Sequence, residues 1–166
     1  MPNRRRDYMA ALAEEATPRL RAVGFGPARI LPSAKYVPIR WPASLWFRKY
    51  TQNDDLHAFV YDDRLALRVH IDAFHGDRRL NNRALDLMRF EVEHDLLDGL
   101  AGNPMLDWRA AVGGDNQVCA LTRPGGISRG DIAGDAEWVT AAAGAWLAAL
   151  SAHPIPDLRA RVQGPS

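Results

Sequence analysis

SLWFRKYTQNDDLHAFVYDDRLALRVHIDAFH, from Ser44 to His75, is the part of the chain where alternation and turn residues agree over the longest span. It is predicted to form a three-stranded antiparallel meander. A two-residue turn at Asp62–Asp63 would place apolar positions of the second and third strands opposite one another: Val60 with Leu65, Ala58 with Leu67 and Leu56 with Val69. A one-residue slip would mix apolar with charged positions on each face, so the pattern favours this register.

The first strand of the meander is predicted to turn at Asn53–Asp54, which pairs Phe47 with Val60 and extends the apolar face. Upstream, Tyr36–Trp41 is predicted as an edge strand. Pro38 is tolerated in such a strand because one side of its backbone needs no partner. The meander, rather than this edge strand, is expected to form the body of the sheet.

The second face of the meander carries aromatic and arginine side chains where a solvated face would carry Thr, Lys, Glu and Ser. Trp, Tyr and Arg are the residues that most often anchor protein interfaces, and aromatic faces also stack nucleic-acid bases. The binding residues predicted on this face are Trp46, Arg48, Tyr50, His57, Phe59, Tyr61 and Arg68.

The rest of the chain predicts three helices and a second hairpin around that sheet. Helical periodicity predicts Arg4–Val23, Asn82–Ala101 and Asp135–Ser151, and alternation predicts strands at Met105–Val112 and Gln117–Arg123. In the first helix, Thr17 either caps a second short helix that begins at Pro18, or one helix kinks there. Gly24 ends it in the left-handed conformation. Small residues of the last helix, Gly144 among them, are expected to let another element approach closely, either inside the fold or in a dimer.

The predicted fold class is α+β: one mainly antiparallel sheet, meander plus hairpin, of about five to six strands. It is packed with an N-terminal helix, a long central helix and a C-terminal helix. Residues 1–166 are predicted to form a single domain, with frayed ends at residues 1–6 and 163–166.

Composition and charge limit the classes of protein to which the chain can belong, but they indicate no chemical reaction. The chain is 47% hydrophobic and 25% charged with a net charge of +1, so no global charge draws it to nucleic acid or membrane. No apolar run is long enough to span a membrane and no signal peptide is visible. Cys119 is the single cysteine, expected to be buried, and cannot form an intrachain disulfide. We expect a cytoplasmic protein without a cofactor.

His70, Asp72 and His75 are the candidates for catalysis, because imidazole and carboxylate on one sheet face could hold a divalent metal or act as a general base and the group that orients it. His-x-Asp is common by chance, and solvated polar residues are the favoured interpretation. No metal site is therefore assigned. A second polar set lies on the predicted central helix: Glu91, His94 and Asp98.

The Gly-rich loop Gly125–Gly130 is flanked by Arg123 and contains Arg129, and these two side chains could grip an anion. The loop lacks the spacing of a P-loop or of a dinucleotide site. A flexible connection is therefore the favoured interpretation, with the anion site as the alternative.

Three functions remain open on the sequence. The favoured hypothesis is a non-catalytic interaction or regulatory protein that binds a protein partner, or a second copy of itself, through the aromatic and arginine face. The first alternative is a nucleic-acid-binding accessory protein that uses the same face. The second is a metal-assisted hydrolase centred on His70, Asp72 and His75. The sequence favours a protein that is not an enzyme.

Overall fold

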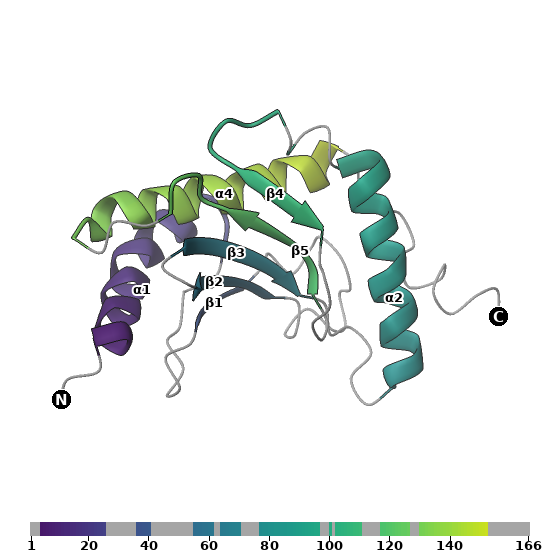
Figure 1. Cartoon of the computed structure of the whole chain (residues 1–166), viewed down its shortest axis with the longest axis horizontal. Coiled ribbons are helices and arrows are strands. Elements are labelled where there is room, and N and C mark those ends of the chain that lie inside the picture. Colours follow the sequence, from purple (N-terminus) through teal and green to yellow (C-terminus); the bar gives the residue numbers. More distant parts are fainter. Residues whose placement is uncertain are drawn as a thin grey trace.

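The fold is taken from a computed structural model, which describes residues 4–25, 36–40, 55–61, 64–70, 77–96, 100, 102–110, 117–126 and 130–152 (Figure 1). The elements in chain order are α1 (Arg4–Ala22), β1 (Tyr36–Arg40), β2 (Asp55–Tyr61), β3 (Arg64–His70), α2 (Arg78–Glu91), the π-helical segment η2 (Val92–Leu96), β4 (Asp107–Ala110), β5 (Gln117–Thr122) and α4 (Ile132–Ala152).

The five strands are hydrogen-bonded in the order β1-β2-β3-β5-β4, and every neighbouring pair is antiparallel. β2 and β3 have the predicted register, with Val60 opposite Leu65 and Tyr61 opposite Arg64. β4 and β5 form the predicted second hairpin. Alternation along β2 and β3 therefore identified the register of this pair, because any slip would have moved Leu65 out of the core.

The prediction for the first strand of the meander is wrong. β1 pairs with β2, with Pro38 opposite His57. A strand has two hydrogen-bonding edges, and β1 and β3 occupy both edges of β2, so the predicted partner strand is not the neighbour of β2. Residues 41–54 lie outside the described part of the chain. The expectation that Pro38 lies in an edge strand is confirmed, since β1 ends the strand order.

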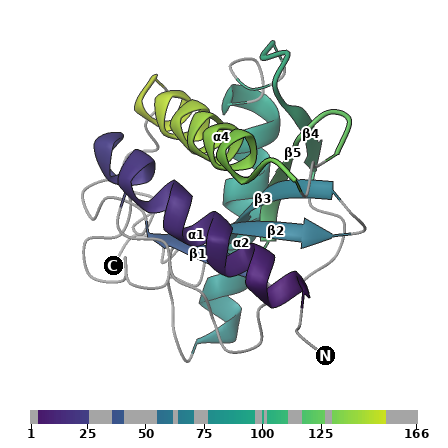
Figure 2. The same cartoon turned by 90° about the vertical axis from the view of Figure 1, so that its left-hand side faces the viewer.

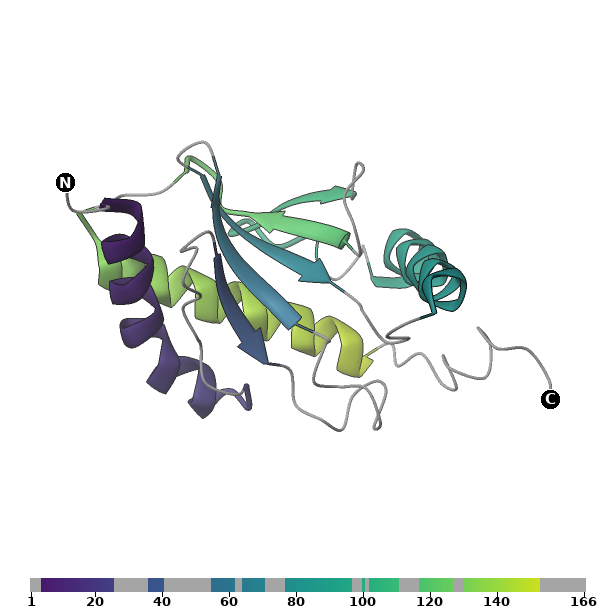
Figure 3. The same cartoon turned by 90° about the horizontal axis from the view of Figure 1, so that it is seen from below.

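α1 and α4 lie along the same side of the sheet and pack against each other, whereas α2 stands at the opposite end of the molecule and packs on β5 (Figures 2 and 3). The described core is one cluster to which all three helices, β3 and β5 contribute. Its largest fully buried side chains are Trp146, Met9, Leu12, Leu20, Leu65, Leu67, Met88 and Leu100. Cys119 is buried among them, as expected.

α1 is a single helix that continues through Pro18. The Thr17 hydroxyl donates to the Ala13 carbonyl at 2.7 Å within it. Thr17 is thus no cap for a second helix. The predicted ending is confirmed: Gly24 has φ 98°, and the Phe25 N–H donates to the Leu20 carbonyl at 2.9 Å. Phe25 is buried against this last turn.

The prediction of one long central helix is also wrong, both in where the helix begins and in its hydrogen bonding after Glu91. α2 begins at Arg78, four residues before the predicted start, because Asp77 caps it: its side chain accepts the Leu80 N–H at 3.0 Å. The α-helical hydrogen bonding ends at Glu91 and is replaced by the wider turn of η2. The predicted buried positions Leu85, Met88 and Val92 do face the core.

The predicted fold class is therefore wrong as stated. The prediction relied on a meander over residues 44–75, a second hairpin and a long central helix, whereas β1 is the outer neighbour of β2 and the central α-helix ends at Glu91. The described residues contain three α-helices, and their buried sheet side chains belong to a two-stranded antiparallel pair, β3 and β5. Inside the fold no element approaches Gly144 closely, since a Cβ there would meet nothing within 4 Å; the approach of a second copy stays a prediction.

Candidate functional site

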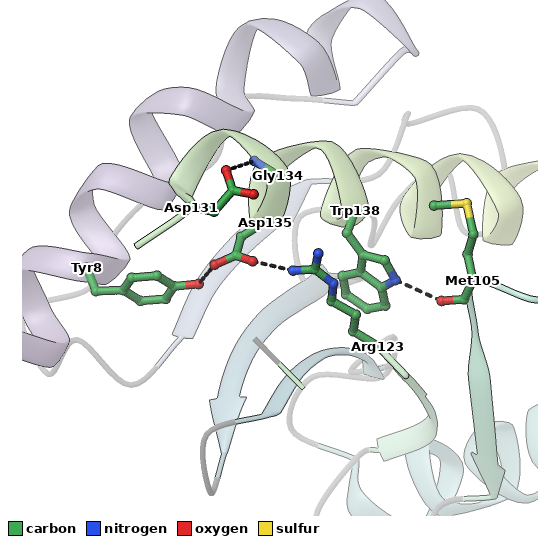
Figure 4. Close-up of polar contacts among 7 residues, drawn as sticks. All are labelled: Tyr8, Met105, Arg123, Asp131, Gly134, Asp135 and Trp138. Carbon is green, nitrogen blue, oxygen red and sulfur yellow. Dashed lines mark hydrogen bonds and ion pairs between the residues drawn. The ribbon is translucent and has the colours of Figure 1, made fainter. Parts of the chain in front are cut away.

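Asp135 is a fully buried carboxylate at the start of α4, and both of its oxygens have partners (Figure 4). The Tyr8 hydroxyl donates to Oδ2 at 2.5 Å, and the Arg123 guanidinium forms an ion pair with Oδ1. Tyr8 comes from α1, and Arg123 follows β5 directly. The cluster Tyr8–Asp135–Arg123 therefore joins three segments that are distant in sequence.

The cluster is stable because Arg123 and Tyr8 offset the free-energy cost of burying the Asp135 carboxylate. A carboxylate removed from water loses several kcal/mol of hydration unless charge and hydrogen bonds replace it. Arg123 supplies the charge and Tyr8 the second hydrogen bond. The first turn of a helix also favours negative charge, because its free N–H groups point that way. The backbone of Arg123 is fixed as well, since its N–H donates to the Leu65 carbonyl at 2.9 Å.

The start of α4 is set by Asp131, whose Oδ1 accepts the Gly134 N–H at 2.9 Å. This is the N-cap arrangement, in which a side-chain oxygen satisfies an N–H that has no partner inside the helix. A Cβ on Gly134 would collide with the Asp131 carboxylate in this position. Glycine at residue 134 therefore lets the cap close over the first turn.

An open pocket of about 450 Å³ lies beside this cluster. Its lining is Pro104, Met105, Arg123, Pro124, Asp131, Gly134, Glu137 and Trp138. The Trp138 indole is buried, and its Nε1 donates to the Met105 carbonyl at 2.8 Å, which fixes that wall (Figure 4). Met105 itself is 44% exposed at the rim.

The charges of the pocket are unequal. The side chain of Arg123 is 26% exposed, and Asp135 already balances its charge. The carboxylates of Asp131 and Glu137 are exposed, and within the described residues neither forms a salt bridge. An apolar wall beneath two acidic groups suits a side chain with an aliphatic stem and a cationic end.

Most of the predicted binding face cannot be compared with this site. Trp46, Arg48, Tyr50, Asp72, His75 and Arg129 lie outside the described residues. His57, Phe59 and Tyr61 belong to β2, and Arg68 and His70 to β3, but only their backbone positions are described. The register places His57 opposite Arg68, as predicted. The nucleic-acid and metal-hydrolase hypotheses on these residues stay predictions.

Of the polar set on the predicted central helix, only His94 has a described side chain. Its Nδ1 lies 2.9 Å from the Phe90 carbonyl, and its ring stacks on the Phe90 ring with centroids 4.0 Å apart. Among the residues that the structure describes, no group of three or more His, Cys, Asp or Glu residues is arranged to hold a metal ion.

Sequence reasoning named Arg123 but missed both of its cluster partners. In the sequence, Asp135 is an acidic residue in the first turn of a predicted helix, where such residues are common. Tyr8 falls beside the apolar stripe of α1 and carries no signal of its own. The one signal in the sequence was an Arg directly after a predicted strand and an Asp in the next helix. This combination is too common to predict an ion pair between them.

Comparisons with protein-family models, with curated proteins and with solved structures found no match to this chain. No helix in the described ranges is both long and apolar enough to cross a membrane.

Proposed function

We propose that this protein acts without catalysis, by binding a protein partner that places a lysine or arginine side chain in the pocket beside Trp138. The observation that supports this proposal most is the ion pair between Arg123 and Asp135 in the pocket wall. Asp135 neutralises Arg123, so the exposed carboxylates of Asp131 and Glu137 dominate the charge that an incoming side chain meets.

The pocket is already formed, which favours binding because little has to be ordered when a partner arrives. The hydrogen bond from Trp138 to Met105 holds one wall. The capped start of α4 holds Asp131 in place, and the buried ion pair holds Arg123. Pro104 and Pro124 add stiff apolar surface to the lining.

The aromatic and arginine face of the sheet remains a second contact surface in this proposal. Strand register supports part of it, since His57, Arg68 and Ala120 occupy one row across β2, β3 and β5. We assign the interaction to the cytoplasm, where a single buried thiol such as Cys119 stays reduced.

The test is selection of peptides from a random displayed library on the immobilised full chain, followed by affinity measurement of the selected peptides. Glu137→Lys is the probing variant, and Glu14→Lys, an exposed position on α1, is its control. We expect the peptides to share a lysine or arginine next to apolar residues, and Glu137→Lys to weaken them about tenfold, which corresponds to about 1.4 kcal/mol. Glu14→Lys should leave their affinity unchanged.

Selected peptides without a shared basic residue, or with equal affinity for wild type and Glu137→Lys, would overturn this assignment of the pocket. A further result against it would be peptides whose affinity survives replacement of their only basic residue by norleucine, which keeps the aliphatic stem but removes the charge.

A further inference from the structure

The outward side of α2 and η2 carries six exposed residues that form one stripe: Arg79, Arg83, Asp86, Phe90, Glu93 and His94. From Arg79 to Glu93 they recur every three or four residues, and His94 follows Phe90 by four, which places them on one side of a helix. The opposite side, with Ala84, Leu85 and Met88, is buried in the core. α2 packs on β5 at the end of the molecule away from α1 (Figure 3), and all six residues of this outer stripe are exposed.

An aromatic pair, Phe90 and His94, lies toward the C-terminal end of the outer stripe. Phe90 is 53% exposed, and the His94 ring stacks on it. The Nδ1 of His94 is held at 2.9 Å from the Phe90 carbonyl, which fixes the ring. Large rings kept rigid and exposed are typical of surfaces that bind something, because little conformational entropy is lost when they are covered.

The charges of the outer stripe divide along the helix. Arg79 and Arg83 stand toward its N-terminal end, and Asp86 and Glu93 lie toward the other end. Cations near a helix N-terminus are unfavourable, and the Asp77 cap and Arg89 in the last turn offset part of this cost. The division also makes the stripe complementary to a second copy of itself that runs in the opposite direction.

We propose that the outer stripe is where two copies of this chain associate, with the two α2 helices antiparallel across a twofold axis beside Asp86 and Leu87. Arg79 and Glu93 stand seven residues, or about 10 Å, on either side of Asp86. The symmetry therefore brings Arg79 of each copy to Glu93 of the other. The same axis brings Arg83 over Phe90, an arrangement that favours a cation–π contact.

A second copy fits the stripe better than a nucleic acid does. A phosphate backbone is uniformly negative, and the carboxylates of Asp86 and Glu93 would repel it on either side of the aromatic pair. In the antiparallel arrangement Glu93 of each copy faces Arg79 of the other, whereas the two Asp86 carboxylates meet near the axis and lower the affinity. A single pair of short helices buries less than a standard interface of about 800 Å² per partner, so we expect dissociation in the micromolar range.

The test is sedimentation velocity of the full-length protein over a range of concentrations. Four variants are compared with wild type: Arg79→Glu, Glu93→Arg, Arg79→Glu with Glu93→Arg in one chain, and the control Arg21→Glu, an exposed position on α1. Each single exchange places like charges at both symmetry-related contacts, so we expect dimer affinity to fall at least tenfold. The double exchange should restore it to within about threefold of wild type. The control should match wild type.

The proposal is overturned if wild type stays monomeric at every concentration, if the single variants dimerise as wild type does, or if the double variant fails to recover. Fluorescence titration with a short single-stranded oligonucleotide at low salt tests the competing partner. Binding that Arg79→Glu abolishes, without any wild-type dimer, would assign the stripe to nucleic acid instead. The pocket beside Trp138 lies elsewhere in the molecule, so either proposal can fail alone.

Discussion

Asp135 is a buried charged side chain whose cost to stability depends on its two partners. Replacing Arg123 with Met would keep much of the volume but leave the buried carboxylate with Tyr8 and no cation. We expect the free energy of unfolding to fall by about 3–5 kcal/mol, measured by urea denaturation. In an Asp135→Leu background the same Arg123→Met change should cost far less, because no buried charge is then left unpaired.

The matched control for this prediction is Arg19→Met. Arg19 pairs with Glu15 at 3.3 Å, but both side chains are well exposed on one face of α1. Solvent-exposed pairs of this kind contribute about 0.3–0.5 kcal/mol. Equal losses for Arg123→Met and Arg19→Met would contradict the structural role given to the buried pair.

Gly134 is a second residue whose role can be isolated. Alanine usually stabilises a helix relative to glycine by up to about 1 kcal/mol. At residue 134, however, its Cβ would displace the Asp131 carboxylate that caps α4. We expect Gly134→Ala to give no gain in wild type but to stabilise an Asp131→Ala background, as read from thermal unfolding of the four proteins in the cycle.

Gly144 provides the comparison within the same helix. A Cβ at this position meets nothing within 4 Å. Gly144→Ala should therefore stabilise the protein by about 0.5–1 kcal/mol, with the increase seen in the same thermal unfolding measurement. A gain of equal size from Gly134→Ala in wild type would show that the Asp131 cap contributes nothing.

At the scale of single elements, α1 carries a proline where a helix normally has none. Pro18 is exposed, lacks the N–H that would bond to the Glu14 carbonyl, and crowds the preceding turn. Pro18→Ala should raise the free energy of unfolding by about 1–2 kcal/mol, less than the intrinsic cost of about 3 kcal/mol because the unfolded chain also gains freedom. Circular dichroism should show unchanged or greater helix content. A lower melting temperature would mean that the distortion at Pro18 is needed for packing.

The elements that sequence reasoning found are those defined by local pattern. The β2–β3 register follows from alternation around a two-residue turn, and the end of α1 follows from Gly24. The partner of β2 was wrong because Tyr36–Arg40 and residues 44–50 both read as strands. Only competition for one edge of β2 decides between them. The start of α2 was late because Asp77 follows a glycine and reads as part of a turn.

The candidate site was largely beyond sequence because its residues meet only in the folded chain. Tyr8 and Asp135 are 127 positions apart, and no period or spacing links them. Arg123 was singled out for its loop, but the partner assigned was an anion from outside rather than Asp135. A buried acid in an Ala-rich helix becomes recognisable only when the cation that neutralises it has been placed.

At the scale of the whole molecule, the three helices differ in the elements that they pack against. α1 and α4 pack on each other and on the sheet, whereas α2 packs on β5 alone among the strands in the principal contacts. In hydrogen–deuterium exchange we expect the middle of α2 to open with a lower free energy than the middle of α4, because fewer neighbours must separate. Met88→Ala should lower α2 protection selectively, and Trp146→Ala should lower both. Equal protection of α2 and α4 in wild type would contradict this difference.

The bond between Tyr8 and Asp135 also sets an order of events during synthesis. At about 5–20 residues per second, the 127 residues that separate them take on the order of ten seconds to be added. For that interval α1 leaves the ribosome with Met9, Leu12 and Leu20 lacking the helix that later covers them. Until α4 has been made, the nascent chain therefore carries the apolar face of α1 without this cover, which makes α1 the segment that a chaperone would hold.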